Sequence, residues 1–354
     1  MAKRMNRREF IVKGSSAVLG AGLAANAGSA FGKPVAAGET SRVIEVAHPG
    51  AVLADRVVDP AIARKMLRRG METLTGSSNP WGKFLSPSDR VGLKINTLGR
   101  PLLYTHHELI AAMVAELEDF GVKKNSIIVW DRFETQMRDC KFEFNTSAGG
   151  VCVYGTDALD ENVRRYDPDV AYVSDFDNPD QRQNGSTASR LSSVFTRDCD
   201  KIINMAILKD HGMSGVTLTL KNLAYGLCDN NRRFHGPKHI GPFIADFCAR
   251  PDVRKKAVLH LIDGLEACYD LGPAPKNPKV IYTADTLWLG TDPVALDAVG
   301  RAAIDAKRKQ EGLVPIRETG RAWDHIELAA QKGAGTADLD RIRVERLDLG
   351  TGAF

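Results

Sequence analysis

Polar residues able to carry acid–base or ligand chemistry stand at the ends of several apolar stretches of this 354-residue sequence. They are Lys94 and Asn96 in GLKIN, Asp131 in IIVWD, Lys209 and His211 in NMAILKDH, and Asp263 in HLID. Lysine ammonium groups bind anions, histidine exchanges protons near neutral pH, and carboxylates orient histidines or hold metal ions. Together these residue types predict a site for an anionic substrate or cofactor.

Catalysis is assigned to His211, Asp263 and Lys209. We expect His211 to be the general acid or base, because its unperturbed pKa is close to the operating pH. Asp263 or Asp131 would orient His211 or help to hold a metal ion. Clustered lysines depress one another's pKa, so one lysine of the site could itself act as a base.

Polar and apolar residues alternate along VTLTLKNL, residues 216–223. This period predicts a half-buried strand with Thr217, Thr219 and Lys221 on one face. A lysine among threonines suits an anion or a carboxylate-rich ligand, and the alternative is an exposed strand face. The ligand-binding residues expected from these patterns are Lys94, Asn96, Asp131, Thr217, Lys221 and Asn222.

The segment CDNNRRFHGPKHIG holds His235 and His239, four positions apart as in helical metal sites. Gly236 and Pro237 interrupt such a helix, yet loop histidines can still converge on a metal ion. A basic surface loop and an anion-binding loop are the alternatives. The six cysteines include no C-x-x-C pair, so we expect no iron–sulfur cluster.

The elements that must position these residues follow from hydrophobic periodicity. We expect strands at 43–48, 90–96, 126–131, 201–208, 257–263, 279–284, 286–290 and 342–349, and helices at 59–76, 105–121, 292–310 and 321–333. Strand–helix–strand spacing predicts parallel pairing, hence an α/β fold with a mostly parallel sheet, flanking helices and a loop-rich insertion at 133–195. Ligands bind at the carboxyl ends of such strands, so the polar strand ends would share one rim.

The first 30 residues have the order of a twin-arginine export signal. Arg7 and Arg8 precede Phe10, and a Gly/Ala-rich run with small-residue cleavage motifs follows. We expect residues 1–30 to be a signal peptide read by the twin-arginine export machinery, 31–42 a linker, and 43–354 a periplasmic or secreted α/β domain. A basic N-terminal helix or an uncleaved anchor is the alternative.

Net charge and hydropathy exclude other partners. Residues 1–30 carry five Lys or Arg against Glu9, a sum of +4, and the whole chain is +4, so the remainder is near neutral. We therefore expect no general attraction to nucleic acid. No later stretch reaches about 18 consecutive apolar residues, so we expect no stable membrane span.

The segments GLKIN, INMAILKDHGMSGVTLTLKNLAYG, LIDGLEA and GTDPVALDAVG resemble the domain of unknown function 362 (DUF362) family over roughly residues 47–306. The lysine-x-histidine element followed by threonine-leucine-lysine-asparagine is the most specific part. The resemblance implies a fold and a site but no reaction. Many relatives carry a ferredoxin-like cysteine cluster, which this sequence lacks. The family's polar positions correspond here to Lys94, Asn96, Lys209, His211, Thr217, Lys221, Asn222, Asp263, Asp292 and Asp297.

Two functions fit these observations. The first is an exported enzyme of unassigned reaction that acts on an anionic substrate or cofactor, with a metal-assisted or redox step as one form of it. The second is a non-catalytic periplasmic protein that holds an anion or delivers a metal. A histidine–carboxylate pair beside the lysines would favour chemistry, and lysines alone would favour binding.

Overall fold

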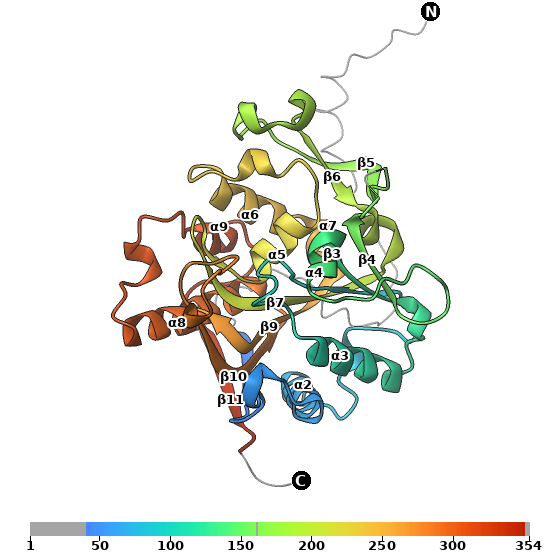
Figure 1. Cartoon of the computed structure of the whole chain (residues 1–354), viewed down its shortest axis with the longest axis vertical. Coiled ribbons are helices and arrows are strands. Elements are labelled where there is room, and N and C mark those ends of the chain that lie inside the picture. The colour runs from blue at the N-terminus through green and yellow to red at the C-terminus, as the bar shows by residue number, and fades with distance from the viewer. Residues whose placement is uncertain (1–39, 161, 351–354) are drawn as a thin grey trace, which may run out of the picture. The chain divides into compact units, whose positions relative to one another are not determined.

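The computed structural model describes residues 40–160 and 162–350, so the predicted signal peptide lies outside the described residues. Its central feature is a nine-stranded sheet of order β11-β1-β10-β9-β7-β2-β3-β4, with β8 paired to β7 (Figure 1). The strands are β1 (Ser41–Ala47), β2 (Val91–Lys94), β3 (Ile127–Phe133), β4 (Cys152–Asp157), β7 (Lys201–His211), β8 (Gly215–Thr217), β9 (Ala257–Cys268), β10 (Ile281–Gly290) and β11 (Ile342–Asp348).

Most neighbouring strands run parallel, which confirms the predicted α/β fold. Strands β9, β7, β2, β3 and β4 form one parallel set, and β11 runs parallel to β1. Strand β10 is antiparallel to both β1 and β9. The carboxyl ends of β2, β3, β7 and β9 therefore lie at one edge of the sheet, where α/β proteins bind their ligands.

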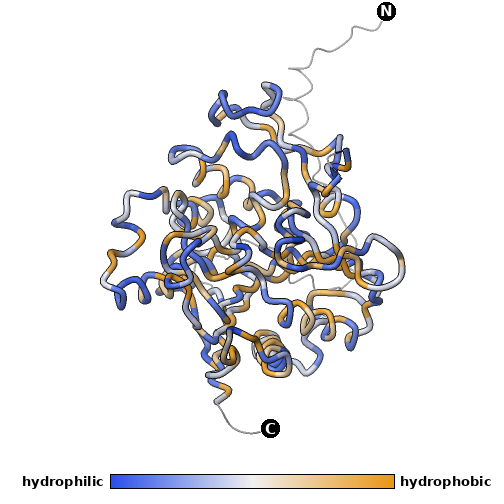
Figure 2. The backbone as a smooth tube through the Cα atoms, in the orientation of Figure 1, coloured by the Kyte–Doolittle hydropathy of each residue, from blue (hydrophilic) through white to orange (hydrophobic). Residues whose placement is uncertain are grey.

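Helices cover both faces of the sheet (Figure 1). The long helices α2 (Pro60–Thr75) and α3 (His107–Phe120) pack on one face, in a core that includes Met66, Leu67 and Leu109. On the other face α5 (Thr219–Gly226) and α8 (Pro293–Gln310) pack against the strands, and α6 (Ile240–Cys248) and α9 (His325–Gln331) pack against these helices. Figure 2 shows hydrophobic and hydrophilic residues interleaved along these elements, as expected where each buries only one side.

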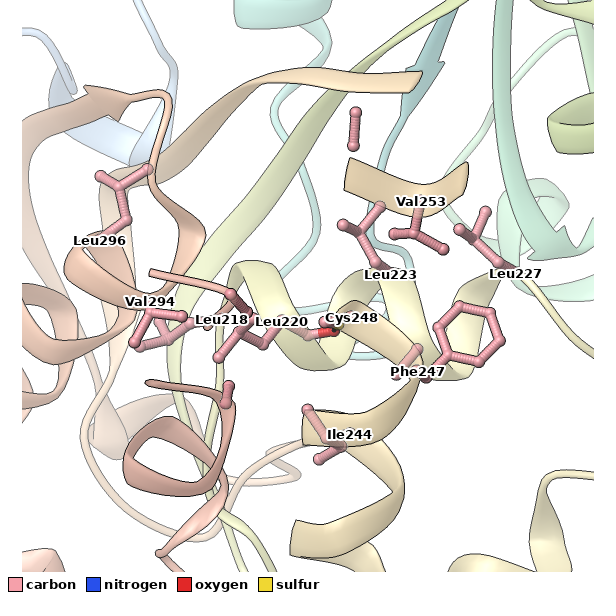
Figure 3. Close-up of a cluster of buried hydrophobic side chains, with 14 of the residues drawn as sticks. Leu218, Leu220, Leu223, Leu227, Ile244, Phe247, Cys248, Val253, Val294 and Leu296 are labelled. Atoms are coloured by element: carbon pink, nitrogen blue, oxygen red, sulfur yellow. Dashed lines mark hydrogen bonds between the residues drawn. The ribbon is translucent and has the colours of Figure 1, made fainter. Parts of the chain in front are cut away.

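The second core centres on α5. Its leucines Leu220 and Leu223 pack with Ile244 and Phe247 of α6 (Figure 3). The thiol of Cys248 donates a hydrogen bond to the Leu220 carbonyl oxygen at 3.2 Å. This packing fixes α5 against its neighbours, so the polar side of the helix is held in a defined position.

The predicted strand at 216–223 is corrected by the structure, in which β8 ends at Thr217 and α5 begins at Thr219. A residue distant in sequence caps the start of α5. The carboxylate of Asp297 on α8 accepts hydrogen bonds from the backbone amides of Thr219 (2.7 Å) and Leu220 (3.0 Å). The alternation in sequence is real, but it spans a strand end and a helix start.

Two further segments differ in detail from their expected form. Residues 133–195 contain α4 (Glu134–Asp139), edge strand β4 and an antiparallel ribbon of β5 (Tyr166–Val173) and β6 (Ala188–Ser192). The two strands expected at 279–290 form the single irregular strand β10, interrupted where Asp285 adopts a φ of 48°. In the part of the chain that the structure describes, no helix is long and apolar enough to cross a membrane.

Candidate anion-binding site

A cavity of about 500 Å³ lies between α5 and the carboxyl ends of β2 and β3. Strand β8 and the loop before α6 contribute its other walls. All six residues predicted to bind a ligand line this cavity: Lys94, Asn96, Asp131, Thr217, Lys221 and Asn222. The parallel strand ends bring three of them together, and α5 brings Lys221 and Asn222.

Lys94 and Asp131 form a buried ion pair at the ends of neighbouring strands. Lys94 Nζ donates to Asp131 Oδ1 at 2.7 Å, and the other carboxylate oxygen accepts from the amide and the hydroxyl of Thr97, each at 2.7 Å. Burial favours the uncharged form of Asp131, but the charge of Lys94 and these hydrogen bonds outweigh it and hold the carboxyl pKa below its usual value. This pair is internally neutral.

Two asparagine amides connect the lysines. The Asn222 side-chain oxygen accepts from Lys94 Nζ at 3.1 Å and from Asn96 Nδ2 at 3.0 Å. The Asn96 side-chain oxygen in turn accepts from Lys209 Nζ at 2.7 Å. Both amides thus turn their oxygens towards ammonium groups. An amide partner satisfies a donor of Lys209 without neutralising its charge.

Lys221 projects from α5 and is buried, yet no hydrogen bond to its ammonium group occurs among the described residues. Its Nζ lies 4.3 Å from the centroid of the Tyr225 ring, one helical turn along α5. Burial, and then repulsion from Lys209, lower the pKa of Lys221 to about 7. Burial also lowers the pKa of Lys209 to about 8. Near neutral pH, Lys221 is therefore present in both protonation states.

His211 ends β7 and is buried close to Lys221 and Lys209, but neither His211 nor Lys209 is among the described residues that line the cavity. Its Nδ1 accepts hydrogen bonds from the backbone amides of Met213 (3.0 Å) and Ser214 (3.1 Å), which assigns the ring proton to Nε2. Burial, followed by the positive charge of Lys221, lowers the pKa of His211 well below its usual value. The imidazole is thus a neutral donor, not a cation.

Buried hydroxyl and ring groups extend this set of donors. Thr217 Oγ1, Tyr225 Oη and His211 Nε2 have no hydrogen-bond partner within the described ranges. Burial raises the pKa of Tyr225 well above 10, so the phenol keeps its proton. An unpaired buried polar group costs about 1–3 kcal/mol, so an oxygen-rich ligand would recover that loss.

One comparison with known proteins places the chain in a family. The family described as domain of unknown function (DUF362) matches residues 91–302. The chain belongs to the DUF362 family. The matched region runs from β2 into α8 and includes every residue that lines the cavity. No curated protein matches the chain.

In this DUF362 protein, Asp263 does not meet His211. Its carboxylate accepts from the backbone amide of His106 at 3.0 Å and contacts His106 Nδ1 at 2.8 Å, at the start of α3. Glu266 Oε2 lies 3.4 Å from the other ring nitrogen. Burial opposes the charge on this ring, but Asp263 and Glu266 raise the pKa of His106 to about 10. Asp131 is likewise committed elsewhere, to Lys94.

His235 and His239 make different ring contacts. His235 is exposed at the cavity, and its ring centroid is 5.6 Å from that of His211 and 5.6 Å from that of Tyr225. His239 precedes α6 and instead contacts Phe176, with ring centroids 5.2 Å apart. Among the described residues, no group of three or more His, Cys, Asp or Glu side chains could hold a metal ion. Metal binding by His235 and His239 of this DUF362 protein stays a prediction.

Sequence reasoning missed Tyr225 and Gly226. A Cβ atom at position 226 would lie 2.2 Å from Lys94 Cε, so the lysine side chain crosses α5 where this glycine leaves room. Tyr225 follows Lys221 by four positions, the spacing of one helix face. The glycine and the four-residue spacing are both present in the sequence, but they indicate these roles only when α5 is recognised as a helix.

Proposed function

We propose that this DUF362 protein binds a small anionic ligand in the cavity and exchanges a proton with it through Lys221. The observation that carries the proposal is the presence of two buried lysines, Lys209 and Lys221, without a carboxylate partner within the described residues. It is an enzyme proposal, because a lysine titrating near neutral pH can act as an acid or a base.

Burying an ammonium group is costly unless an opposite charge compensates it. A bound anion would supply that charge to Lys209 and Lys221. Thr217 Oγ1 and Tyr225 Oη in the lining, and His211 Nε2 next to the lining residue His235, would donate to its oxygen atoms, since none of the three has a partner within the described ranges. In this proposal His211 is a hydrogen-bond donor to developing negative charge, since its ring is neutral and its Nδ1 is already occupied.

A non-catalytic role in anion binding or assembly is the second candidate. It is favoured by the absence of a carboxylate partner for His211 within the part of the chain described. Turnover of a ligand that binds the cavity would exclude this role. Elemental mass spectrometry of the natively produced protein tests the remaining hypothesis of a metal-assisted or redox step.

We also propose that the protein acts in the periplasm or outside the cell after twin-arginine export. The support is the Arg7-Arg8 pair and the small-residue run that follows it. Replacing both arginines with lysine should leave the protein in the cytoplasm, and fractionation of the producing cells measures this. Unchanged export of that variant would contradict the proposal.

Thermal unfolding in the presence of single anions tests the binding proposal. Pyruvate, citrate, phosphate and sulfate are compared with chloride at equal ionic strength, in wild type, K209M and K221M. We expect at least one oxyanion to raise the Tm of wild type and to lose that effect in both variants. K123M, an exposed lysine elsewhere, is the charge-matched control. Equal shifts in wild type and K221M would contradict the proposal.

A further inference from the structure

We propose that Lys221 forms a Schiff base with the carbonyl group of a small 2-oxo carboxylate held in the cavity. This inference rests on the proposed function and names its substrate class. It starts from the position of one atom, the Nζ of Lys221, which faces a cavity and has no hydrogen-bond partner among the described residues.

The three lysines of the site differ in what occupies their amino groups. Lys94 Nζ donates to Asp131, Asn222 and its neighbouring backbone carbonyl. Lys209 Nζ donates to Asn96. Only a lysine without such bonds can turn a nitrogen lone pair towards a carbon atom. Lys221 meets this condition, and its pKa of about 7 leaves a large neutral fraction at physiological pH.

The surroundings of Lys221 select the ligand. Lys209 is buried next to the cavity, where its charge acts on Lys221 and its ammonium group donates to the lining residue Asn96, and it would attract the carboxylate of a 2-oxo acid. Thr217 lies opposite Lys209 in the β7–β8 pairing; its hydroxyl has no partner among the residues the structure describes and would donate to the carbonyl oxygen. A carboxylate adjacent to a carbonyl presents both groups within one small molecule. The aromatic ring of Tyr225, one turn further along α5, packs against the amino group of Lys221.

The step balances without an oxidant or a reductant. The ammonium first releases one proton; the neutral Nζ then attacks the carbonyl carbon, a C–N bond forms, and a proton passes from the nitrogen to the oxygen to give a carbinolamine. The C–O bond then breaks and the oxygen leaves as water with a second proton. The net change converts one lysine ammonium and one carbonyl into one protonated imine and one water. Tyr225 Oη is protonated and has no hydrogen-bond partner among the described residues, and in this proposal it relays those protons.

Reductive trapping tests the inference. Wild type is incubated with pyruvate and cyanoborohydride at neutral pH, and the modified lysines are located by peptide mass spectrometry. We expect adduct at Lys221 far in excess of that at the exposed Lys123. A pKa of about 7 against the ordinary value gives about 10³-fold more neutral amine at neutral pH. K221R should carry no adduct in that peptide.

The comparison between lysines is made within wild type, so it holds even if K221R folds poorly. Labelling of Lys221 no faster than of Lys123 would overturn the inference. The thermal shift with pyruvate separates the two proposals. A Tm shift with pyruvate but no trapped adduct at Lys221 would contradict the Schiff base and leave the anion-binding proposal standing. If no oxyanion shifts the Tm and Lys221 is not trapped, both proposals fall.

Discussion

Lys94 Nζ lies 2.7 Å from Asp131 Oδ1, and both side chains are buried at the ends of adjacent parallel strands. The pair neutralises one of the three lysines in the site. Arg132, which also lines the cavity, pairs with Asp157, so the excess positive charge comes from Lys221 and Arg232 in the lining and from Lys209 buried next to it. The charge that would attract a ligand is thus separated from the ion pair that stabilises the strand ends.

Replacing Asp131 with asparagine should destabilise the protein strongly. Removing one partner of a buried ion pair leaves an uncompensated charge and costs about 3–5 kcal/mol. D139N is the matched control, because Asp139 pairs with Arg100 at a solvent-exposed position, where such pairs contribute about 0–1 kcal/mol. Urea unfolding measures both free energies. Similar values for the two variants would show that Asp131 does not compensate Lys94.

Replacing Gly226 with alanine should displace Lys94. The new Cβ would lie 2.2 Å from Lys94 Cε, and three hydrogen bonds prevent that side chain from moving freely. We expect a cost of about 1–3 kcal/mol together with weaker anion binding. G82A is the control, since its Cβ would meet nothing closer than 3.6 Å. Thermal unfolding with and without the bound oxyanion gives both readings, and a G226A protein indistinguishable from G82A would refute the clash.

The stability of the ligand-free protein should rise with pH above neutrality because of Lys221. The folded pKa of about 7 lies below the unfolded value, so the unfolded chain binds the extra proton between those pH values. For one extra proton bound by the unfolded chain, the free energy of unfolding rises by up to about 1.4 kcal/mol per pH unit. The titratable groups that face Lys221 are Lys209, His211, His235, His325 and Tyr225.

Urea unfolding of wild type and K221M between about pH 7 and 8.5 measures this contribution as a difference, since Lys209 and the buried cysteines are present in both proteins. The difference in unfolding free energy between the two proteins should increase in favour of wild type as the pH rises. The unfolding free energy of K123M should change with pH in the same way as that of wild type. A pH-independent difference between wild type and K221M would place the Lys221 pKa near that of an ordinary lysine.

Replacing Asp297 with alanine should disrupt the start of α5. The change leaves the buried amides of Thr219 and Leu220 without acceptors, at about 1–3 kcal/mol each. D59A is a matched cap removal on α2, where Asp59 accepts from two amides near the surface and the expected cost is about 1 kcal/mol. Chemical denaturation compares them. A D297A cost no larger than that of D59A would contradict the assigned cap.

The strand ends of the site were predictable from the sequence, because parallel strands place their carboxyl ends at one edge. Lys94, Asp131 and Lys209 illustrate this. The conformation around Lys221 was not predictable from local periodicity, since the carboxylate that caps the start of α5 belongs to Asp297, far along the chain. The partner of Asp263 was also hidden, because sequence alternation does not tell which face of a sheet a given residue meets. Asp263 turned towards His106 at the start of α3.

The most direct test of the account is calorimetric titration of pyruvate into wild type and K221M at about pH 6.5 and pH 9.0, on either side of the Lys221 pKa. We predict binding to wild type at the lower pH, about tenfold or more weaker binding at the higher pH, and loss of both the affinity and its pH dependence in K221M. Equal affinity of wild type and K221M for pyruvate, or no binding by wild type at either pH, would contradict it.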